Sequence, residues 1–262
     1  MKGLLTKIIF VFNLFGFELI KFTSFFRGLP FYFRDYRRLK RQMKINDDFA
    51  FGKCYPVLNE RFNESGTMNG HYFHQDLLIA RKIYENKPVR HIDVGSRTDG
   101  FVAHIASFRE IEIFDIRPIK STVKNIVYKQ ANLMLLPDNM RECTDSLSSL
   151  HVIEHFGLGR YGDPIDVDGH LKAINNLHSM LIPNGRFYFS VPIGKQRIEF
   201  NAHRIFSVKY LLQILDDRFT IAGFHYIDDK GDLFENVNLS EDSVGHNFNC
   251  SYGCGIFELI KK

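Results

Sequence analysis

The sequence predicts an α/β protein: a mostly parallel sheet covered by helices on both faces, with an antiparallel hairpin at one edge and an N-terminal helical arm. Three observations lead to this prediction. Short apolar strand patterns alternate with helical patterns from about residue 70 onward. The stretch Val89–Gly100 combines a buried strand, a glycine turn and the beginning of a helix. Two late strand patterns, at 219–227 and 255–260, are separated only by a polar loop, which favours antiparallel pairing.

The chain of 262 residues has the length of one large α/β domain, or of one domain with an appendage. We expect residues 1–68 to form a basic and apolar arm and lid, and residues 69–262 to form the main domain. The four cysteines are too few and too scattered for a disulfide scaffold, so reduced thiols and a cytoplasmic location are predicted. Cys250 and Cys254 have no further Cys or His pair at ligand spacing, and no metal centre is predicted.

The positive charge of the chain is concentrated in the arm. Residues 1–44 contain ten Lys or Arg and only two acids, whereas acids outnumber bases in the remainder. The main domain is therefore mildly acidic, and nucleic-acid binding is not predicted.

The apolar run between Lys7 and Lys21 is thirteen residues long and is interrupted by Asn13 and Glu18, so it is too short to span a membrane. No small-residue cleavage site follows it, which disfavours a signal peptide. Two interpretations remain for the segment 1–21. We expect a helix packed on the domain, and the alternative is peripheral contact with a membrane interface through the basic residues.

Hydrophobic periodicity places the first elements of the main domain. The segment 45–70 is rich in glycine and polar residues and is expected to be irregular. A helix is predicted from Tyr72 to Asn86, where Pro88 follows. The next strands share short apolar runs and are expected at 89–94, 110–115, 125–129 and 146–151. A helix at 98–107 should follow the first of them.

The second half continues in the same way. A helix from about Asp168 to Leu181 has one apolar face, and 183–185 is predicted as a turn. A strand at 186–191 is stopped by Pro192. The remaining predicted elements are a helix and two closing strands, at 208–215, 219–227 and 255–260, with a polar loop at 228–249.

An acid stands at the end of each of the first two strands. Asp93 ends the first strand and is followed by Gly95, and Asp115 ends the second strand 22 residues later. A strand, a glycine turn, a helix, a second strand and an acid about 20 residues on are typical of a nucleoside-binding βαβ unit.

Five motifs in order resemble those of class I S-adenosylmethionine-dependent methyltransferases, over roughly residues 70–262. They are His91-Ile-Asp-Val-Gly95, Phe114-Asp115, Gln130-Ala-Asn-Leu133, Ser149-Leu-His-Val-Ile-Glu-His155 and Leu181-Ile-Pro-Asn-Gly-Arg186. More narrowly, H-V-I-E-H-F-G-L-G-R-Y-G-D at 151–163 resembles an uncharacterised methyltransferase-like family whose members are seen in surface-polysaccharide settings.

The resemblance implies a Rossmann-like class I methyltransferase sheet and S-adenosyl-L-methionine as the cofactor. Asp115 would hold the ribose hydroxyls, and Asn132 with Leu133 would hold the adenine. Asp93 and the glycine turn would lie at the methionine portion of the cofactor. The implied cofactor residues are Asp93, Gly95, Ser96, Arg97, Asp115, Ile116, Asn132, Leu133 and His151.

The glycine motif departs from the family pattern. Arg97 and Asp99 occupy the second and third glycine positions, and Gly100 comes one residue late. Glycine allows close approach of backbone to ligand at such positions. Arg97 has two possible roles. It pairs with the cofactor carboxylate, in which case the protein is an enzyme, or it fills the pocket, in which case the fold does not bind the cofactor. We expect the first.

Methyl transfer to a hydroxyl needs a base near neutral pH, and histidine is the usual choice. His155 is our first candidate for this base and His203 the second, with Glu154 as a supporting catalytic residue. The loop 157–168 is either a polar surface for a hydroxylated acceptor or a surface loop with turn chemistry in which Asp168 caps the following helix. The candidate acceptor residues are Tyr72, Arg160, Tyr161 and Asp163.

Two metal-dependent interpretations are weighed against this one. The acids of the loop with His155 and His170 would suit a divalent cation, as in magnesium-dependent sugar O-methyltransferases. His151-Val-Ile-Glu-His155 also matches a zinc-protease signature, but that signature must lie on a helix, and here it follows a strand.

The sequence therefore predicts O-methylation of a saccharide or another small hydroxylated acceptor, in polysaccharide biosynthesis. The alternative is a methyltransferase-like fold without catalysis that acts as a binding or scaffold protein in polysaccharide assembly. The acceptor and the oligomeric state are left open.

Overall fold

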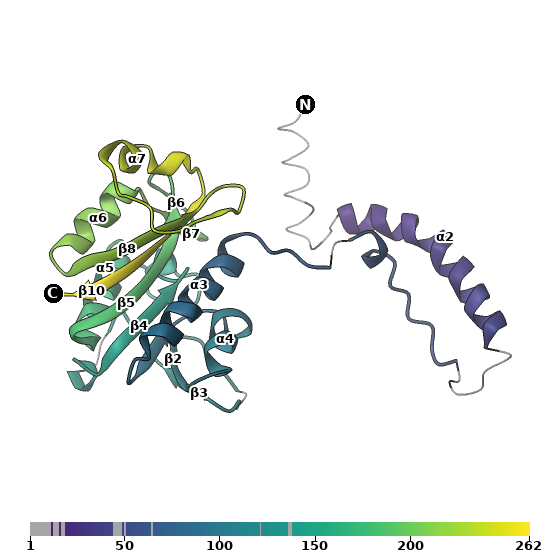
Figure 1. The fold of residues 1–262 in the computed structure, drawn as a ribbon, viewed down its shortest axis with the longest axis horizontal. Coiled ribbons are helices and arrows are strands. Elements are labelled where there is room, and N and C mark those ends of the chain that lie inside the picture. The colour runs from purple at the N-terminus through teal and green to yellow at the C-terminus, as the bar shows by residue number, and fades with distance from the viewer. Residues whose placement is uncertain are drawn as a thin grey trace. The chain divides into compact units, whose positions relative to one another are not determined.

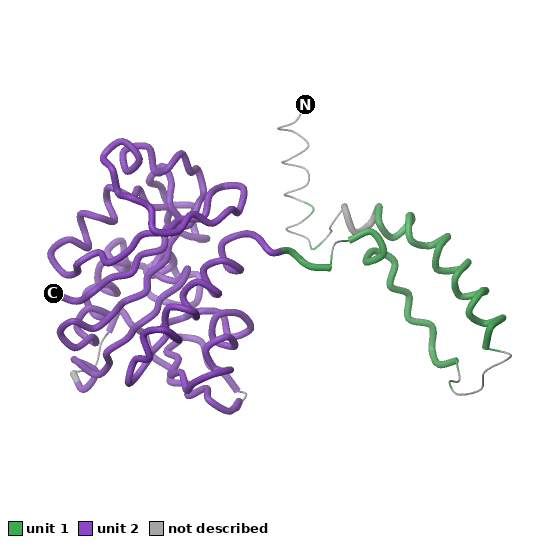
Figure 2. Tube along the Cα trace, in the orientation of Figure 1, with its two compact units in different colours: residues 1–67 green, residues 68–262 purple. Residues whose placement is uncertain are grey.

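The computed structural model of the protein describes residues 19–43, 51–63, 65–120, 122–135 and 138–262, together with the single residues 12, 16 and 49. The chain forms two compact units, Met1–Thr67 and Met68–Lys262, shown in green and purple in Figure 2. Each unit is described separately.

Among its described residues, the first unit contains one long helix, α2 (Leu19–Gln42), and a short 3₁₀ helix, η1 (Glu60–Phe62). A Cβ on Gly28 would lie 2.0 Å from the carbonyl oxygen of Leu58, so the returning chain passes close to the helix there. Arg27 lies 4.0 Å from the ring centroid of Phe62. Most of the predicted arm helix at 1–21 falls outside the described residues, and none of the helices in the described part is long and apolar enough to cross a membrane.

The second unit is built on an eight-stranded sheet with the order β3-β2-β1-β4-β5-β10-β8-β9 (Figure 1). The strands are β1 (His91–Val94), β2 (Ile111–Asp115), β3 (Ile126–Gln130), β4 (Thr144–Leu150), β5 (Leu181–Ile193), β8 (Phe219–Ile227), β9 (Leu233–Phe234) and β10 (Gly253–Lys261). Strands β1 to β5 are parallel, whereas β10 pairs antiparallel with both β5 and β8. The predicted fold class, a mostly parallel sheet with an antiparallel edge, is confirmed.

The antiparallel edge differs in one respect from the predicted hairpin. Strand β10 does not lie outside β8 but between β5 and β8, and β9 forms the outer edge. The polar loop at 228–249 also contains β9, α7 (Glu241–Gly245) and the 3₁₀ helix η5 (Asn247–Asn249). A second sheet of two short strands, β6 (Arg197–Glu199) and β7 (His203–Ile205), was not predicted.

The remaining helices are α3 (His71–Asn86), α4 (Ala103–Ala106), α5 (Gly169–Met180) and α6 (Val208–Asp216), with 3₁₀ turns η3 (Asp138–Met140) and η4 (Ile153–His155). The predicted helix at 98–107 is shorter than expected. It begins as a π-helical turn, η2 (Thr98–Val102), in which Gly100 has non-helical angles, and only α4 is regular. A Cβ on Gly100 would lie 2.6 Å from Asp76 Oδ2 of α3, so this close approach interrupts the helix.

The predicted turn at 183–185 is a bulge inside β5. Pairing with β4 jumps from Thr144–Leu181 to Ser146–Arg186, and Asn184 has a φ of +63°. The extra residues are accommodated without ending the strand.

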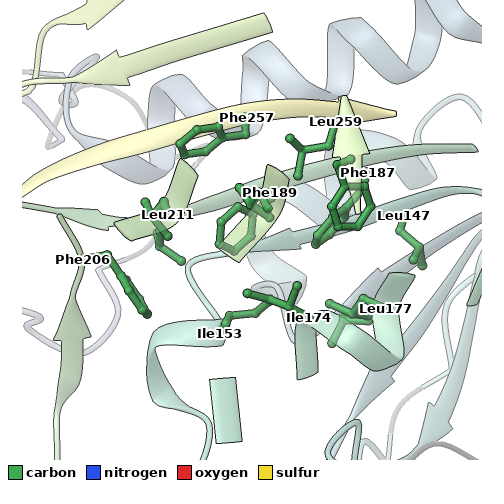
Figure 3. Packing of buried hydrophobic residues seen from close by; sticks show 14 of the residues in the cluster. Leu147, Ile153, Ile174, Leu177, Phe187, Phe189, Phe206, Leu211, Phe257 and Leu259 are labelled. Carbon is green, nitrogen blue, oxygen red and sulfur yellow. The ribbon is translucent and has the colours of Figure 1, made fainter. Parts of the chain in front are cut away.

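Both faces of the sheet are buried, as expected for parallel strands. Side chains alternate along β5, so Phe187 and Phe189 face one layer while Tyr188 faces the other. The first layer packs against α5 and α6 through residues such as Ile174, Leu177 and Leu211 (Figure 3). The second layer packs against α3, η2 and α4, through Ile79, Ile83, Phe101 and Ile105.

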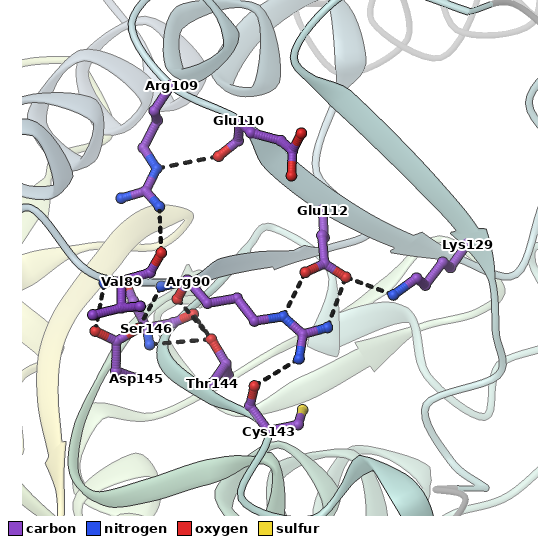
Figure 4. Close-up of polar contacts among 10 residues, drawn as sticks. All are labelled: Val89, Arg90, Arg109, Glu110, Glu112, Lys129, Cys143, Thr144, Asp145 and Ser146. Carbon is purple, nitrogen blue, oxygen red and sulfur yellow. Dashed lines mark hydrogen bonds and ion pairs between the residues drawn. The ribbon is translucent and has the colours of Figure 1, made fainter.

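A polar cluster joins the strands of the parallel half (Figure 4). Glu112 on β2 accepts two hydrogen bonds from the Arg90 guanidinium, at 2.5 and 2.8 Å, and one from Lys129 Nζ on β3 at 2.6 Å. Arg90 also donates to the carbonyl oxygen of Cys143, just before β4. The cluster therefore ties four chain segments together beside the core.

Candidate active site

The carboxyl ends of β1, β2, β3 and β4 lie at one edge of the sheet, where open α/β sheets bind ligands. Two cavities open there. The open space in the first, including solvent at its mouth, is about 540 Å³, and that in the second is about 1010 Å³. Both are lined by Gly95, Arg117, His151, His155 and Tyr161, so they meet along these residues.

The first cavity is a mainly apolar slot between strand ends. Its lining includes Phe114, Asp115, Ile116, Ala131, Asn132, Leu133 and Phe156. The Oδ1 atom of Asn132 accepts a hydrogen bond from Met134 N at 3.0 Å, which fixes the orientation of its amide. A flat apolar slot with a carboxylate and an amide at its edge suits a nucleoside.

The turn after β1 requires glycine at position 95. Gly95 has a φ of +70°, and a Cβ there would lie 2.6 Å from Val152 Cγ1. Its N–H donates to the carbonyl oxygen of Phe114 at 2.9 Å, which joins the turn to the end of β2.

Asp93 fixes this turn through hydrogen bonds to its carboxylate. Its carboxylate accepts hydrogen bonds from Ser148 Oγ at 2.5 Å, Ser96 Oγ at 2.7 Å and Ser96 N at 3.1 Å. Burial raises the pKa of Asp93 to about 6. Asp93 lines neither cavity, so the structure places it behind the turn and not at a ligand surface.

Asp115 lies at the end of β2 with both carboxylate oxygens occupied. Arg117 donates to it from its backbone N at 2.8 Å, from Nε at 3.0 Å and from Nη2 at 2.6 Å. The guanidinium of Arg117 also lies 4.5 Å from the ring centroid of Tyr161. Asp115, Arg117 and Tyr161 thus form a connected edge along the first cavity.

Arg97 does not fill the first cavity. Its guanidinium pairs with Asp99 at 2.8 and 3.1 Å, and the two side chains are 59% and 70% exposed. It also lies 5.3 Å from the ring centroid of Tyr72 and lines the second cavity.

His151 connects the two cavities and has an unusual backbone conformation. Its φ is +56°, a strained value for a residue other than glycine. Its Nδ1 lies 2.8 Å from Glu154 Oε1, and both side chains are buried. Burial alone would lower the pKa of His151, but Cys254 and Glu154 reverse this and raise it to about 10.

His155 has the geometry of a neutral imidazole with one nitrogen available. Its Nδ1 lies 2.7 Å from the carbonyl oxygen of Ala202, so Nδ1 carries the proton and Nε2 is the acceptor. Nε2 lies 3.8 Å from Glu154 Oε1. Burial lowers the pKa of His155, although Glu154 opposes the effect.

His203 reaches the second cavity because the β6–β7 hairpin carries it there. Its ring centroid lies 6.4 Å from that of His155 and 5.2 Å from that of Tyr252. Its Nε2 is 3.2 Å from Glu199 Oε2, an ion-pair distance without hydrogen-bond geometry.

The loop at 157–168 is organised by Asp163. The carboxylate of Asp163 accepts hydrogen bonds from the backbone N–H groups of Gly157, Gly159 and Tyr161. Arg160 Nη1 donates to the carbonyl oxygen of Ala202 at 3.0 Å, so the loop is tied to the hairpin. Arg160 and Tyr161 line the second cavity, whereas Asp163 lines the first.

Neither metal-dependent interpretation from the sequence finds support in these positions. In the described part of the chain, the loop acids with His155 and His170 form no group of three candidate ligands. His170 Nε2 is instead paired with the hydroxyl of Tyr210 at 2.7 Å. The His151–His155 segment lies on a 3₁₀ turn, and the Nδ1 atoms of these two histidines have different partners.

The structure brings together most residues that the sequence singles out, and adds others. Tyr72, Glu154, His155, Arg160, Tyr161 and His203 all line the second cavity. Arg117 was missed, although its charge two residues after Asp115 is a usable signal. Tyr252 was also missed, and no local pattern marks it because it reaches the site only through the pairing of β10.

A family model described as "Caenorhabditis protein of unknown function, DUF268" matches residues 119–247, which include the loop at 157–168. No curated protein matches the chain. Among solved structures, the chain is similar to a Burkholderia thailandensis 1,6-didemethyltoxoflavin-N1-methyltransferase with bound 1,6-didemethyltoxoflavin and S-adenosylhomocysteine. That similarity has 12% identity and a TM-score of 0.51, and covers 72% of this chain and 78% of that chain.

The chain is also similar to the [4+2]-cyclase SpnF, at 14% identity and a TM-score of 0.50, over 72% of this chain and 80% of that chain. Similarity at this identity establishes the fold. The predicted class I methyltransferase fold is therefore confirmed, while the chemistry has to be argued from the site.

Proposed function

We propose that the protein transfers a methyl group from S-adenosyl-L-methionine to a hydroxyl of a saccharide or another small hydroxylated acceptor. The observation that carries this proposal is the junction of the two cavities. A slot suited to a nucleoside meets a polar, histidine-lined cavity at Gly95, His151 and His155. Methyl transfer needs a donor and an acceptor held in line across such a junction.

The residues of the first cavity fit the cofactor. Asn132 and Leu133 offer a polar and an apolar edge to adenine, and Asp115 offers its carboxylate to the ribose. Because both oxygens of Asp115 are occupied, the exposed guanidinium of Arg117 has to share or release them. Arg97 would similarly exchange Asp99 for the cofactor carboxylate, since that ion pair is exposed.

The cofactor supplies an electrophilic methyl group on a positively charged sulfur. His155 Nε2 would accept the proton of the acceptor hydroxyl as that oxygen takes the methyl group from the sulfur. The Ala202 carbonyl keeps the proton of His155 on Nδ1, and Glu154 at 3.8 Å stabilises the imidazolium that forms.

A polyhydroxylated acceptor suits the second cavity. Hydroxyl, guanidinium and imidazole groups surround it, from Tyr72, Arg160, Tyr161, His203 and Tyr252. The second oxygen of Glu154, Oε2, is buried there without a hydrogen bond among the described residues and can accept one from a ligand hydroxyl. The motif resemblance at 151–163 supports a role in polysaccharide biosynthesis, in the cytoplasm or peripherally at a membrane.

Titration calorimetry with S-adenosylmethionine and S-adenosylhomocysteine tests the proposal. We expect both to bind the full chain, and Asp115→Asn to weaken binding about tenfold, which corresponds to the loss of one charge-assisted contact. A matched control is Asp217→Asn, which removes an exposed acid at the end of α6, outside both cavities. If neither ligand binds the folded protein, the proposal is wrong.

The second candidate is a methyltransferase-like fold that binds a ligand without catalysis, as a scaffold in polysaccharide assembly. The observation in its favour is the pairing of Asp115 with Arg117, which satisfies both carboxylate oxygens without a ribose. Absence of cofactor binding in the same titration, with wild-type circular dichroism, would support this candidate.

A further inference from the structure

Three side chains with metal-ligating atoms converge beside the second cavity. They are His71 at the start of α3, His151 after β4, and Cys254 in β10. One ligand atom of each lies within 4.8 Å of the ligand atoms of the other two. Across the part of the chain that the structure describes, this is the only group of three or more His, Cys, Asp or Glu side chains placed in this way.

His151 has the arrangement of a metal-bound imidazole. Such imidazoles usually donate their other ring N–H to a carboxylate or a carbonyl oxygen. The Nδ1 of His151 is 2.8 Å from Glu154 Oε1, and the two side chains are only 4% and 2% exposed. The Nε2 of His151 is buried and makes no hydrogen bond of normal geometry within the described residues, and the Cys254 thiol is its neighbour. A buried nitrogen of this kind needs a partner.

Cys254 has similarly incomplete surroundings. The thiol of Cys254 is fully buried, and its contacts with Gln75 Oε1 and the Gly255 carbonyl are long, at 3.8 and 3.9 Å. A single S–H proton cannot serve both. The ring of His71 stacks on that of His151, with centroids 5.1 Å apart and planes 9° apart, so a half-buried imidazole lies beside the buried imidazole of His151 and the buried thiol of Cys254.

We propose that His71, His151 and Cys254 bind a zinc ion, with Glu154 as the residue that orients His151. Two imidazoles and a thiolate are a donor set that suits zinc. Zinc–nitrogen bonds of about 2.0 Å and zinc–sulfur bonds of about 2.3 Å bring tetrahedral ligand atoms to roughly 3.5 Å from one another. The ligand atoms therefore have to approach by about 1 Å, and the ring of the half-buried His71 has to turn out of its parallel stack so that the ion lies in the plane of both imidazoles.

Three protein ligands leave the fourth zinc position open, as in catalytic zinc sites. His71 and His151 line a cavity of about 700 Å³ together with Tyr72, Asp229 and Tyr252. Water or a small oxygen ligand can reach the ion from this side. Zinc binding at these residues can be measured by itself, so this proposal does not depend on the proposed methyl transfer.

The test uses the full chain, purified without a polyhistidine tag and reconstituted with one equivalent of zinc or cobalt(II). We expect about one zinc per chain by mass spectrometry after desalting. The cobalt form should show a thiolate-to-cobalt charge-transfer band and the visible bands of tetrahedral coordination. Absence of retained zinc and of the charge-transfer band in the wild type would overturn the proposal.

Variants assign the ligands. Cys254→Ser should lose the charge-transfer band, whereas Cys143→Ser, a half-buried cysteine near Arg90, should keep it. Glu154→Gln should weaken zinc binding about 10–100-fold, as expected for a residue that orients a ligand. His71→Ala, near the surface, provides a second ligand deletion should Cys254→Ser fail to fold. A charge-transfer band that persists in Cys254→Ser, or wild-type affinity in His71→Ala, would refute the assignment.

Discussion

The Glu112 cluster allows a stability prediction whose size follows from the structure. Glu112 is held by Arg90 and Lys129, and its own side chain is only 14% exposed. The hydrogen bonds from Arg90, followed by those from Lys129, lower the pKa of Glu112 from 4.5 to about 2 despite the opposing effect of burial. Replacement by Gln removes the charge while keeping the shape of the side chain.

A shift of this size corresponds to roughly 3 kcal/mol in favour of the ionised, folded state. The partners Arg90 and Lys129 are 37% and 47% exposed, so solvent screens the interaction. We therefore expect Glu112→Gln to cost about 2 kcal/mol at pH 7, or about 4–8 °C in Tm. Urea unfolding followed by circular dichroism measures it, with the exposed Glu110→Gln as the matched control.

The difference should also depend on pH in one direction. Because the folded pKa is lowered, the stabilisation is fully present above about pH 4.5 and is lost as the pH falls toward 2. At pH 3.5 the difference between wild type and Glu112→Gln should have shrunk by about two-fifths. A difference that stays constant from pH 7 to 3.5, or that equals the effect of Glu110→Gln, would refute this reasoning.

Two further predictions concern catalysis and the arm. His155→Gln should lower kcat by roughly 10²–10⁴-fold with unchanged cofactor affinity. The control His104→Gln, on the exposed side of α4, should change neither kcat nor cofactor affinity. Equal activity of the two variants would exclude His155 as the base. The arm prediction concerns the exposed bases of α2, which are Arg37, Arg38, Lys40 and Arg41. Their replacement by Ser should abolish flotation of the protein with anionic liposomes and leave its flotation with neutral liposomes unchanged. Equal flotation of the wild type and the variant with anionic liposomes would argue against membrane contact through α2.

The parallel half of the sheet was predictable because each of its strands has a local signal. β1, β2 and β3 are short apolar runs bounded by polar residues, and they were placed to within two residues. The β6–β7 hairpin has no such signal, since its two strands are three residues each and largely polar. The position of β10 between β5 and β8 depends on pairing between distant segments, which periodicity does not report.

The candidate site likewise contains residues that local sequence patterns identify and residues that only the fold brings together. Asp115, His151 and His155 follow strand ends, so the rule that ligands bind at the carboxyl edge identifies them. The spacing of cysteines and histidines along the chain gave no reason to combine Cys254 with His71 and His151. Only the fold brings these residues, from three separate elements, within 4.8 Å of one another.

The interior position of β10 sets the order in which the sheet can be completed during synthesis. Strands β1 to β5 pair with one another and can assemble while the chain is still growing. Strand β8 has no partner in that half, because β10 lies between it and β5. The edge of β5 therefore remains an open template until residues 253–261 have left the ribosome, and during that interval the nascent chain is exposed to strand pairing with other molecules.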